Sequence, residues 1–233
     1  MKFHATPIHG LWEIETAPHG DARGSLTRLY CADAFAEVAP GLRFVQVNHS
    51  ITARRGTLRG MHFQRAPASQ GNVALPLSGI PAGDGRLWPA LGRSRGNVAL
   101  PLSGIPSGDG RLWPALGRSE AKLIRCLRGR VFDVAVDLRF ASPTFAQWHA
   151  VELSEDNQRQ VLIPPGCAHG FQTLADHCEL LYQHSAAYAP HCEDGVAHDD
   201  PLLAIAWPEP VTELSPRDQG FALLSADFKG VRT

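Results

Sequence analysis

Apolar and polar residues alternate with a period of two along much of the chain, which predicts many short strands. The clearest case is residues 130–138, where Val131, Asp133, Ala135 and Asp137 alternate with Phe132, Val134, Val136 and Leu138. Further strands are predicted at residues 8–16, 42–51, 121–127, 145–153, 161–164, 168–174, 179–184 and 203–207. One short helix is expected at residues 31–38, ending near Pro40. This pattern indicates an all-β sandwich or barrel of antiparallel strands.

The strand predicted at residues 57–64 carries a histidine between apolar positions. Strict alternation would place Arg59, Met61 and Phe63 on one face, and Gly60, His62 and Gln64 on the other. Gly60 would then leave room over the His62 ring, which suits a pocket. The alternative is that His62 is a hydrogen-bonded histidine of the core.

Two polar features each allow two interpretations. The strand at residues 42–51 has a polar face that includes Gln46 and Asn48, and such a face is either solvated or lines a barrel interior that holds a polar ligand. The turn at residues 20–24 carries Arg23, which is either solvated or contacts an anion.

A segment of 25 residues occurs twice in tandem. Residues 71–95 and 96–120 differ only at Ala82/Ser107 and Arg95/Glu120. A solenoid needs at least three copies that stack, and prolines and glycines interrupt each copy here. We therefore expect one domain over residues 1–233, with residues 71–119 as an irregular, partly disordered insertion in one hairpin. A role as a lid or partner-binding loop is the alternative.

Charge and cysteine content narrow the class of protein. The 22 basic and 23 acidic residues give a net charge of −1, so nothing favours nucleic acid or an anionic membrane, and anionic ligands would have to meet local arginines. The chain has no apolar run of membrane-spanning length and begins without the apolar stretch of a signal peptide, which predicts a cytoplasmic protein. Its five cysteines contain no C-x-x-C pair, so reduced structural thiols are expected.

Several motifs together resemble one known family. They are GDARG (20–24), QVNHS (46–50), GTLRGMHFQ (56–64), KLIR (122–125), VFDVAVDLR (131–139), SPTF (142–145), IPPGCAHGF (163–171), ELLY (179–182), Tyr188 and SPRD (215–218). In this order and spacing, with residues 71–119 removed, they resemble the dTDP-4-dehydrorhamnose 3,5-epimerase family. The resemblance implies a cupin-type jelly roll with few short helices, a homodimer, a dTDP-sugar substrate, and neither a metal nor an organic cofactor.

The resemblance also implies a catalytic role for four residues. His62 would remove a proton from a sugar carbon beside the C4 ketone, and Asp218 would pair with His62 and raise its basicity. Lys122 would stabilise the enolate oxygen, and Tyr182 would return a proton from the opposite face. Such chemistry needs a base with a pKa near 7 and a preorganised cation for the enolate.

The resemblance further implies a set of substrate-binding residues, with Tyr188 stacking on the thymine. They are Arg23, Gln46, Asn48, Arg59, His169, Tyr188, Glu193 and Arg217. Arginine side chains match phosphate geometry, which would account for anion binding by a nearly neutral protein. Two departures from the family pattern are visible, Arg28 in place of an acidic residue and Val47 within the usual Gln-Asp-Asn.

Two other functions remain as alternatives. A metal-dependent cupin would use His62 and His169, but Gly60 stands where the first histidine of a His-x-His pair would be. A sugar-nucleotide-binding protein without catalysis would keep the fold and lose proton exchange. Within the epimerase hypothesis, the sequence does not decide between C3, C5 or both. The other histidines are expected in structural or surface positions, namely His49, His149, His177, His184, His191 and His198.

Overall fold

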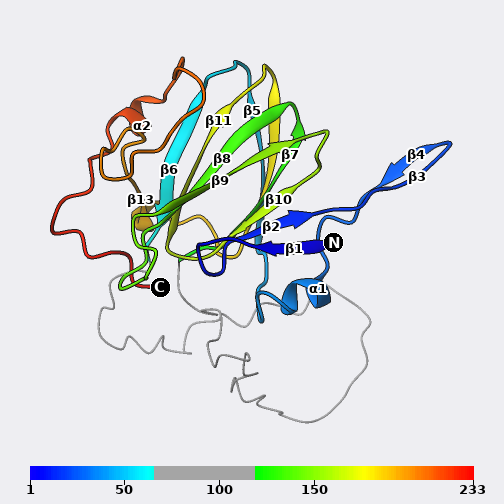
Figure 1. The fold of residues 1–233 in the computed structure, drawn as a ribbon, viewed down its shortest axis with the longest axis horizontal. Coiled ribbons are helices and arrows are strands. Elements are labelled where there is room, and N and C mark those ends of the chain that lie inside the picture. The colour runs from blue at the N-terminus through cyan, green and yellow to red at the C-terminus, as the bar shows by residue number, and fades with distance from the viewer. Residues whose placement is uncertain (66–118) are drawn as a thin grey trace, which may run out of the picture.

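The computed structural model describes residues 1–65 and 119–233, which form two facing antiparallel sheets and a separate two-stranded sheet at residues 19–26 (Figure 1). The six-stranded sheet has the order β1-β2-β10-β7-β12-β5, and the five-stranded sheet has the order β13-β6-β11-β8-β9. The elements are β1 (Lys2–Ala5), β2 (Trp12–Glu15), β3 (His19–Asp21), β4 (Gly24–Leu26), α1 (Ala32–Ala36), β5 (Gln46–Thr52), β6 (Leu58–Gln64), β7 (Lys122–Arg128), β8 (Arg130–Asp137), β9 (Trp148–Ser154), β10 (Gln160–Ile163), β11 (Cys167–Thr173), β12 (Cys178–His184), the 3₁₀ helix η1 (Pro190–Cys192), β13 (Glu193–Gly195) and α2 (Pro216–Gln219). The expected all-β architecture with few short helices is confirmed.

Strand β8 shows why the two sheets hold together. Its alternating side chains enter two separate apolar clusters, with Val131 and Ala135 in the core between the sheets and Val134 and Val136 on the outer face of the five-stranded sheet. The C-terminal segment covers that outer face. Residues 203–207, predicted as a strand, form no strand and pack there through Leu203, Ile205 and Trp207, so that expectation was wrong.

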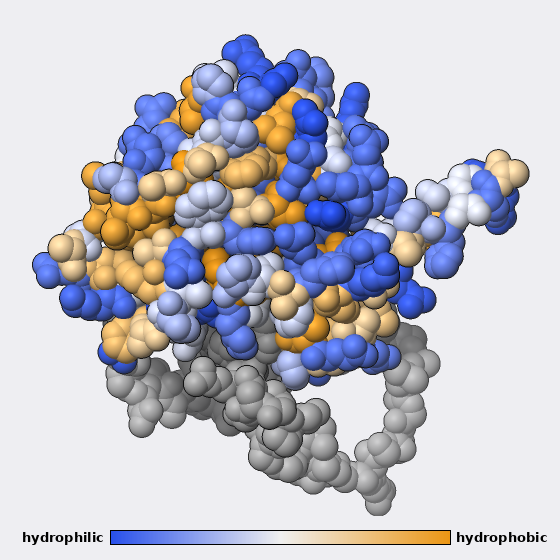
Figure 2. Space-filling view, viewed as in Figure 1, coloured by the Kyte–Doolittle hydropathy of each residue, from blue (hydrophilic) through white to orange (hydrophobic). Residues whose placement is uncertain are grey.

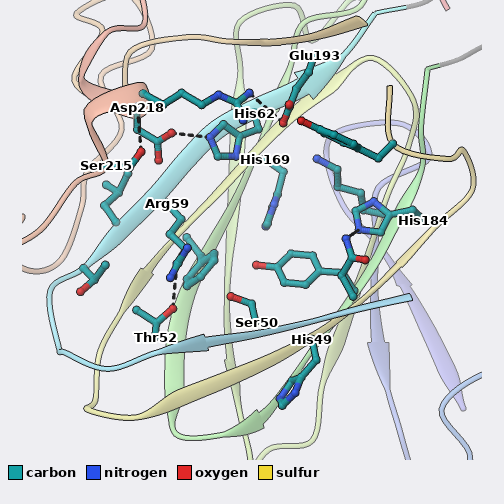
Figure 3. A pocket seen from close by; sticks show the side chains of 18 of the residues that line it. His49, Ser50, Thr52, Arg59, His62, His169, His184, Glu193, Ser215 and Asp218 are labelled. Carbon is teal, nitrogen blue, oxygen red and sulfur yellow. Dashed lines mark hydrogen bonds and ion pairs between the residues drawn. The ribbon is translucent and has the colours of Figure 1, made fainter. Parts of the chain in front are cut away.

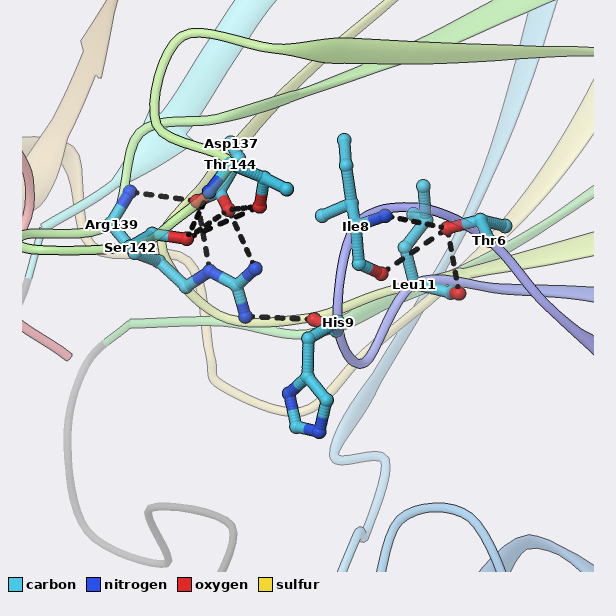
Figure 4. A network of polar contacts seen from close by, with 8 residues as sticks. All are labelled: Thr6, Ile8, His9, Leu11, Asp137, Arg139, Ser142 and Thr144. Carbon is cyan, nitrogen blue, oxygen red and sulfur yellow. Dashed lines mark hydrogen bonds and ion pairs between the residues drawn. The ribbon is translucent and has the colours of Figure 1, made fainter.

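A buried carboxylate joins the N-terminal segment to the loop after β8 (Figure 4). Asp137 accepts hydrogen bonds from Ser142, Thr144 and Arg139, whose Nε lies 2.9 Å from Oδ1. Arg139 also donates from Nη1 to the carbonyl oxygen of His9 at 2.8 Å. Burial alone would raise the pKa of Asp137, but these hydrogen bonds outweigh it and lower the pKa to about 2. The ionised carboxylate therefore anchors the turn before β2.

The connection between β6 and β7 differs from the expectation. These strands lie in different sheets and do not pair with each other, so β6 and β7 do not form the expected hairpin. The duplicated segment itself lies outside the described residues except for its end at Ser119 and Glu120. That it forms an insertion within a single domain stays a prediction.

Smaller features agree with the sequence or extend it. The helix expected at residues 31–38 is present as α1, and β1, β3, β4 and β13 are additional strands that were not predicted. All five cysteines are free thiols, as expected. In the described part of the chain, no helix has the length and apolar character needed to cross a bilayer.

Candidate active site

A pocket of about 1260 Å³ opens between the two sheets (Figure 3). One wall is built by β6 and β11 of the five-stranded sheet, and the other by β5, β7 and β12 of the six-stranded sheet, with the segment that leads into α2 at the rim. All predicted site residues except Arg23 line it, namely Gln46, Asn48, Arg59, His62, Lys122, His169, Tyr182, Tyr188, Glu193, Arg217 and Asp218. The polar face predicted on β5 therefore lines the interior.

A bulge in β6 decides which of its side chains reach the pocket. His62 pairs with His169 and Arg59 with Phe171, so three residue steps on β6 oppose two on β11. The extra residue brings Arg59 and His62 to the same pocket and corrects the prediction that they face opposite sides. Gly60 has φ +134°, and a Cβ there would lie 2.5 Å from the Cα of Gly170. The glycine thus permits close contact between backbones and is not needed for room over the His62 ring.

His62 is held by a carboxylate at its side. Its Nε2 lies 2.8 Å from Oδ1 of Asp218, whose Oδ2 accepts the Gly60 N–H at 3.1 Å. Burial alone would raise the pKa of Asp218, but these hydrogen bonds lower it. Since an ionised carboxylate only accepts, Nε2 carries the ring proton, and Nδ1 is the nitrogen with a free lone pair. Ser215 fixes Asp218 by accepting its backbone N–H at 3.1 Å.

Lys122 and Tyr182 lie on the facing sheet. Lys122 begins β7 and is almost buried, while Tyr182 lies in the middle of β12, the strand that pairs with β7. Burial, together with the nearby Asp133, raises the pKa of Tyr182 well above its usual value. The phenol is therefore protonated at neutral pH. The pocket places a histidine base on one wall and a cation and a phenolic acid on the other.

A second histidine lies directly beside His62 in the β6–β11 register. The Nε2 of His169 is 2.9 Å from Oδ2 of Asp133, and both side chains are buried. Burial lowers the pKa of His169, and the attraction of Asp133 offsets this only in part. Asp133 Oδ1 has no hydrogen-bond partner among the described residues.

The remaining predicted residues form the rim and the floor. Arg217 pairs with Glu193 at 2.9 Å, and Glu193 raises the pKa of Tyr188 by accepting a hydrogen bond from its hydroxyl. Arg59 donates from Nε to Thr52 Oγ1 at 3.0 Å, which holds the guanidinium at the pocket wall. Among the described residues, no group of three or more histidines, cysteines or carboxylates has a metal-binding arrangement.

The sequence of the chain matches a known family over most of its length. A family model described as dTDP-4-dehydrorhamnose 3,5-epimerase matches residues 5–80 and 115–226. The chain belongs to this epimerase family. The resemblance found in the motifs is thereby confirmed.

Relatives and solved structures of the epimerase family agree with this assignment. The dTDP-4-dehydrorhamnose 3,5-epimerase of Pseudomonas aeruginosa is 35% identical over 230 residues, which covers 97% of this chain and 98% of that protein. The dTDP-4-dehydrorhamnose 3-epimerase of Streptomyces niveus is 33% identical, covering 97% of this chain and 84% of that protein. The structure of dTDP-6-deoxy-D-glucose-3,5-epimerase from Legionella pneumophila, in complex with dTDP-4-keto-L-rhamnose, has a TM-score of 0.71 at 32% identity and covers 100% of this chain and 98% of that one. The predicted cupin-type jelly roll is confirmed.

One predicted residue of this epimerase-family site lies elsewhere in the chain. Arg23 sits in the turn between β3 and β4, in a two-stranded arm of residues 19–26 that projects from the body (Figures 1 and 2). Its side chain is 90% exposed and pairs with Asp21 of the same turn. Within its own chain, Arg23 therefore does not reach the pocket.

Sequence reasoning missed four charged or titratable residues that line the pocket, namely His49, Glu120, His184 and Glu213. His184 was expected in a structural or surface position, which was wrong, because it lines the pocket and hydrogen-bonds Glu120. The alternation of strand side chains could have predicted the positions of His184 and Glu120. His184 lies two residues after Tyr182, and Glu120 lies two residues before Lys122. Side chains two apart on a strand share a face.

Proposed function

We propose that this protein epimerises a dTDP-4-keto-6-deoxy sugar at C3, C5 or both, by base-catalysed enolisation in deoxysugar biosynthesis of the dTDP-L-rhamnose type. One observation carries the proposal: the His62–Asp218 pair lies on one sheet, and Lys122 and Tyr182 lie on the facing sheet of the same pocket. Inversion of a carbon needs a base on one side of the sugar and an acid on the other. This arrangement supplies both.

His62, Lys122 and Tyr182 each carry out one part of the proposed reaction. Nδ1 of His62 removes the proton from a carbon next to the C4 ketone, and the electron pair of the broken C–H bond moves onto the ketone oxygen. The Lys122 ammonium stabilises the resulting enolate charge. Tyr182 then donates its proton to the opposite face of the carbon, and the ketone forms again. Proton exchange with water afterwards restores His62 and Tyr182, so the reaction is an isomerisation with no net gain or loss of atoms.

The raised pKa of Tyr182 supports its role as the acid, because the phenol keeps its proton until the enolate takes it. Arg59 and Arg217 supply guanidinium groups for the diphosphate, while Gln46, Asn48 and His169 contact the rest of the ligand. Tyr188, which is 58% exposed at the rim, offers a ring for the thymine. The dTDP-sugar bound in the Legionella pneumophila relative supports this class of substrate.

Incubation with dTDP-4-dehydro-6-deoxyglucose in deuterated water tests the proposal, with deuterium at C3 and C5 followed by NMR. Exchange at both carbons identifies a double epimerase, and exchange at one identifies a single-site enzyme. Relatives named as 3,5-epimerase and as 3-epimerase have similar identities to this chain, so both outcomes fit the family. Binding of dTDP without exchange at either carbon would overturn catalysis and leave a sugar-nucleotide-binding protein.

We further propose a homodimer in which the arm of residues 19–26 brings Arg23 to the pocket of a second copy. The arm projects from its own body, and its Leu26 is 76% exposed. The edge strand β5 also leaves Val47 and Ile51 each 61% exposed, and exposed apolar side chains on an edge strand suit a partner. A cytoplasmic location stays a prediction.

Mixing two inactive variants tests this arrangement. Arg23→Ala and His62→Ala should each lose activity alone, and a refolded mixture should regain it, because one mixed site then contains both native residues. A sedimentation measurement gives the oligomeric state independently. A monomer, or a mixture without recovered activity, would contradict the shared site.

A further inference from the structure

Five polar contacts form one continuous series across the wall of the pocket that the six-stranded sheet builds. It starts at the rim, where the backbone N–H of Tyr188 donates to Oε1 of Gln46 at 3.0 Å. Nε2 of Gln46 lies 3.2 Å from Oδ1 of Asn48, and Nδ2 of Asn48 lies 3.3 Å from Nε2 of His184. The ring of His184 thus connects the amide side chains of β5 to the interior of the pocket (Figure 3).

The series of polar contacts ends at Glu120, which has a different contact at each carboxylate oxygen. Nδ1 of His184 lies 2.9 Å from Oε2, and Nζ of Lys122 lies 3.0 Å from Oε1. The Glu120 and Lys122 side chains are only 11% and 9% exposed, so water competes little for this ion pair. Burial alone would raise the pKa of Glu120, but Lys122 and His184 lower it to about 2. Glu120 is therefore an acceptor in both contacts.

The donor and the acceptor of each contact in this series can be assigned in only one way. A backbone N–H always donates, so the Gln46 oxygen accepts and the Gln46 nitrogen donates to Asn48. The Asn48 nitrogen must then donate to Nε2 of His184, which therefore carries no proton. The proton of the neutral ring lies on Nδ1 and is donated to Glu120. The geometry thus requires the Nδ1–H tautomer of His184.

We propose that Glu120 is a positioning residue that fixes the Lys122 ammonium through one oxygen and, through His184, orients the amide side chains of Gln46 and Asn48 with the other. The proposal rests on the proposed function, in which Lys122 stabilises the enolate and the two amides hold substrate. His184 also stacks on Tyr182, with ring centroids 6.0 Å apart and 16° between the planes. Glu120 thereby supports the cation directly and the acid through one intervening ring.

Glu120 also has a distinct place in the sequence. It is the last residue of the second 25-residue copy, and the corresponding residue of the first copy is Arg95. An arginine at this place would face Lys122 with a like charge and could accept no hydrogen bond from His184. The two copies are therefore not equivalent at the one position that reaches the pocket among the described residues.

Glu120→Gln tests the proposal, because the amide keeps the shape of the side chain and has one acceptor oxygen in place of two. Because Lys122 and His184 contact different oxygens of Glu120, a glutamine in the same place turns its NH₂ group toward one of the two. We expect kcat in the deuterium-exchange assay to fall about 10- to 100-fold, the range known for partners that orient metal ligands. His184→Leu keeps the ion pair and breaks the link to the amides, so KM should rise more than kcat falls.

A spectroscopic readout is independent of turnover. Nitrogen-15 NMR of His184 in the free wild-type protein should show a protonated Nδ1 and an unprotonated Nε2, and Glu120→Gln should change this pattern. Glu13→Gln is the matched control, since it breaks another carboxylate–histidine pair, with Nε2 of His149 2.9 Å from Oε1 of Glu13, outside the pocket. We expect the control to leave kcat, KM and the His184 signals as in the wild type.

The outcomes separate this proposal from the proposed function. A wild-type protein without exchange overturns the epimerase assignment, whatever the His184 signals show. An active wild type combined with an unchanged kcat in Glu120→Gln, or with an Nε2–H tautomer of His184, overturns the role of Glu120. Thermal unfolding of each variant identifies any loss of activity that comes from misfolding alone.

Discussion

The pocket contains two histidine–aspartate pairs made of the same residue types in opposite surroundings. His62 is 28% exposed beside Asp218, whereas His169 is 5% exposed beside Asp133. The two histidines are direct neighbours in the β6–β11 register. The first ring is held at one nitrogen and reaches the pocket with the other, while the second ring is almost buried in the pocket wall.

The difference shows that the pairing alone does not define a catalytic base. Burial lowers the pKa of His169, so its ring is neutral at neutral pH and is a structural part of the pocket wall. His62 keeps access to solvent and ligand, which proton transfer requires. Exposure, and not the partner, separates the two roles.

The largest expected effect is the loss of turnover in His62→Ala. Removing a general base should lower kcat by about 10²- to 10⁴-fold, while the free energy of unfolding should change by about 1 kcal/mol or less, because water can fill the open site. The matched change His169→Ala should cost about 2–4 kcal/mol of stability, since it leaves Asp133 buried without its partner. Deuterium exchange and urea unfolding measure both. A strongly destabilised His62→Ala would support the core-histidine alternative.

Gly60→Ala should disturb both pairs at once. Its Cβ would approach the Cα of Gly170 to 2.5 Å, so β6 and β11 must separate where His62 and His169 meet. We expect a loss of about 2–4 kcal/mol in unfolding free energy. Gly20→Ala is the control, because its Cβ would meet nothing closer than 3.6 Å. Equal stability of the two variants would show that the close approach is not needed.

Asp218→Asn tests the His62–Asp218 pair, the catalytic one of the two. The amide no longer selects the His62 tautomer with Nε2 protonated, so kcat should fall about 10- to 100-fold. The parallel change Asp133→Asn should reduce kcat less, since His169 is not the base. Steady-state kinetics of both variants measures this. The reverse order would assign the catalytic histidine to the buried pair.

The smallest effect is a difference in the pH dependence of stability. The pKa of His169 is lowered in the folded state, so the unfolded chain binds the extra proton, and stability falls as pH drops below about 6.5, by up to about 1.4 kcal/mol per pH unit. The pKa of Asp218 is also lowered, but its contribution is lost only below about pH 4. The variant His169→Gln should lack the loss of stability that begins below about pH 6.5, as measured by urea unfolding across pH 4–7. An unchanged profile would contradict the prediction.

Much of the fold follows from local pattern. Alternation predicted nine of the strands that the structure contains, namely β2 and β5 to β12, and the motifs predicted many of the residues that line the pocket. Alternation wrongly predicted a strand at residues 203–207. There, Leu203, Ile205 and Trp207 alternate because they cover a neighbouring sheet and not because they form a strand. A periodic apolar pattern reports burial of one face, and both arrangements satisfy it.

The sequence by itself determined the residue types of the site, its family and the all-β architecture, because strand period and motif spacing are properties of the chain alone. Only the tertiary structure decided that Arg59 and His62 share a pocket, that Arg23 lies outside it, and that Glu120 joins Lys122 to His184. These outcomes depend on a bulge and on contacts between segments far apart in sequence. No local pattern contains that information, because it arises only when the two sheets face each other.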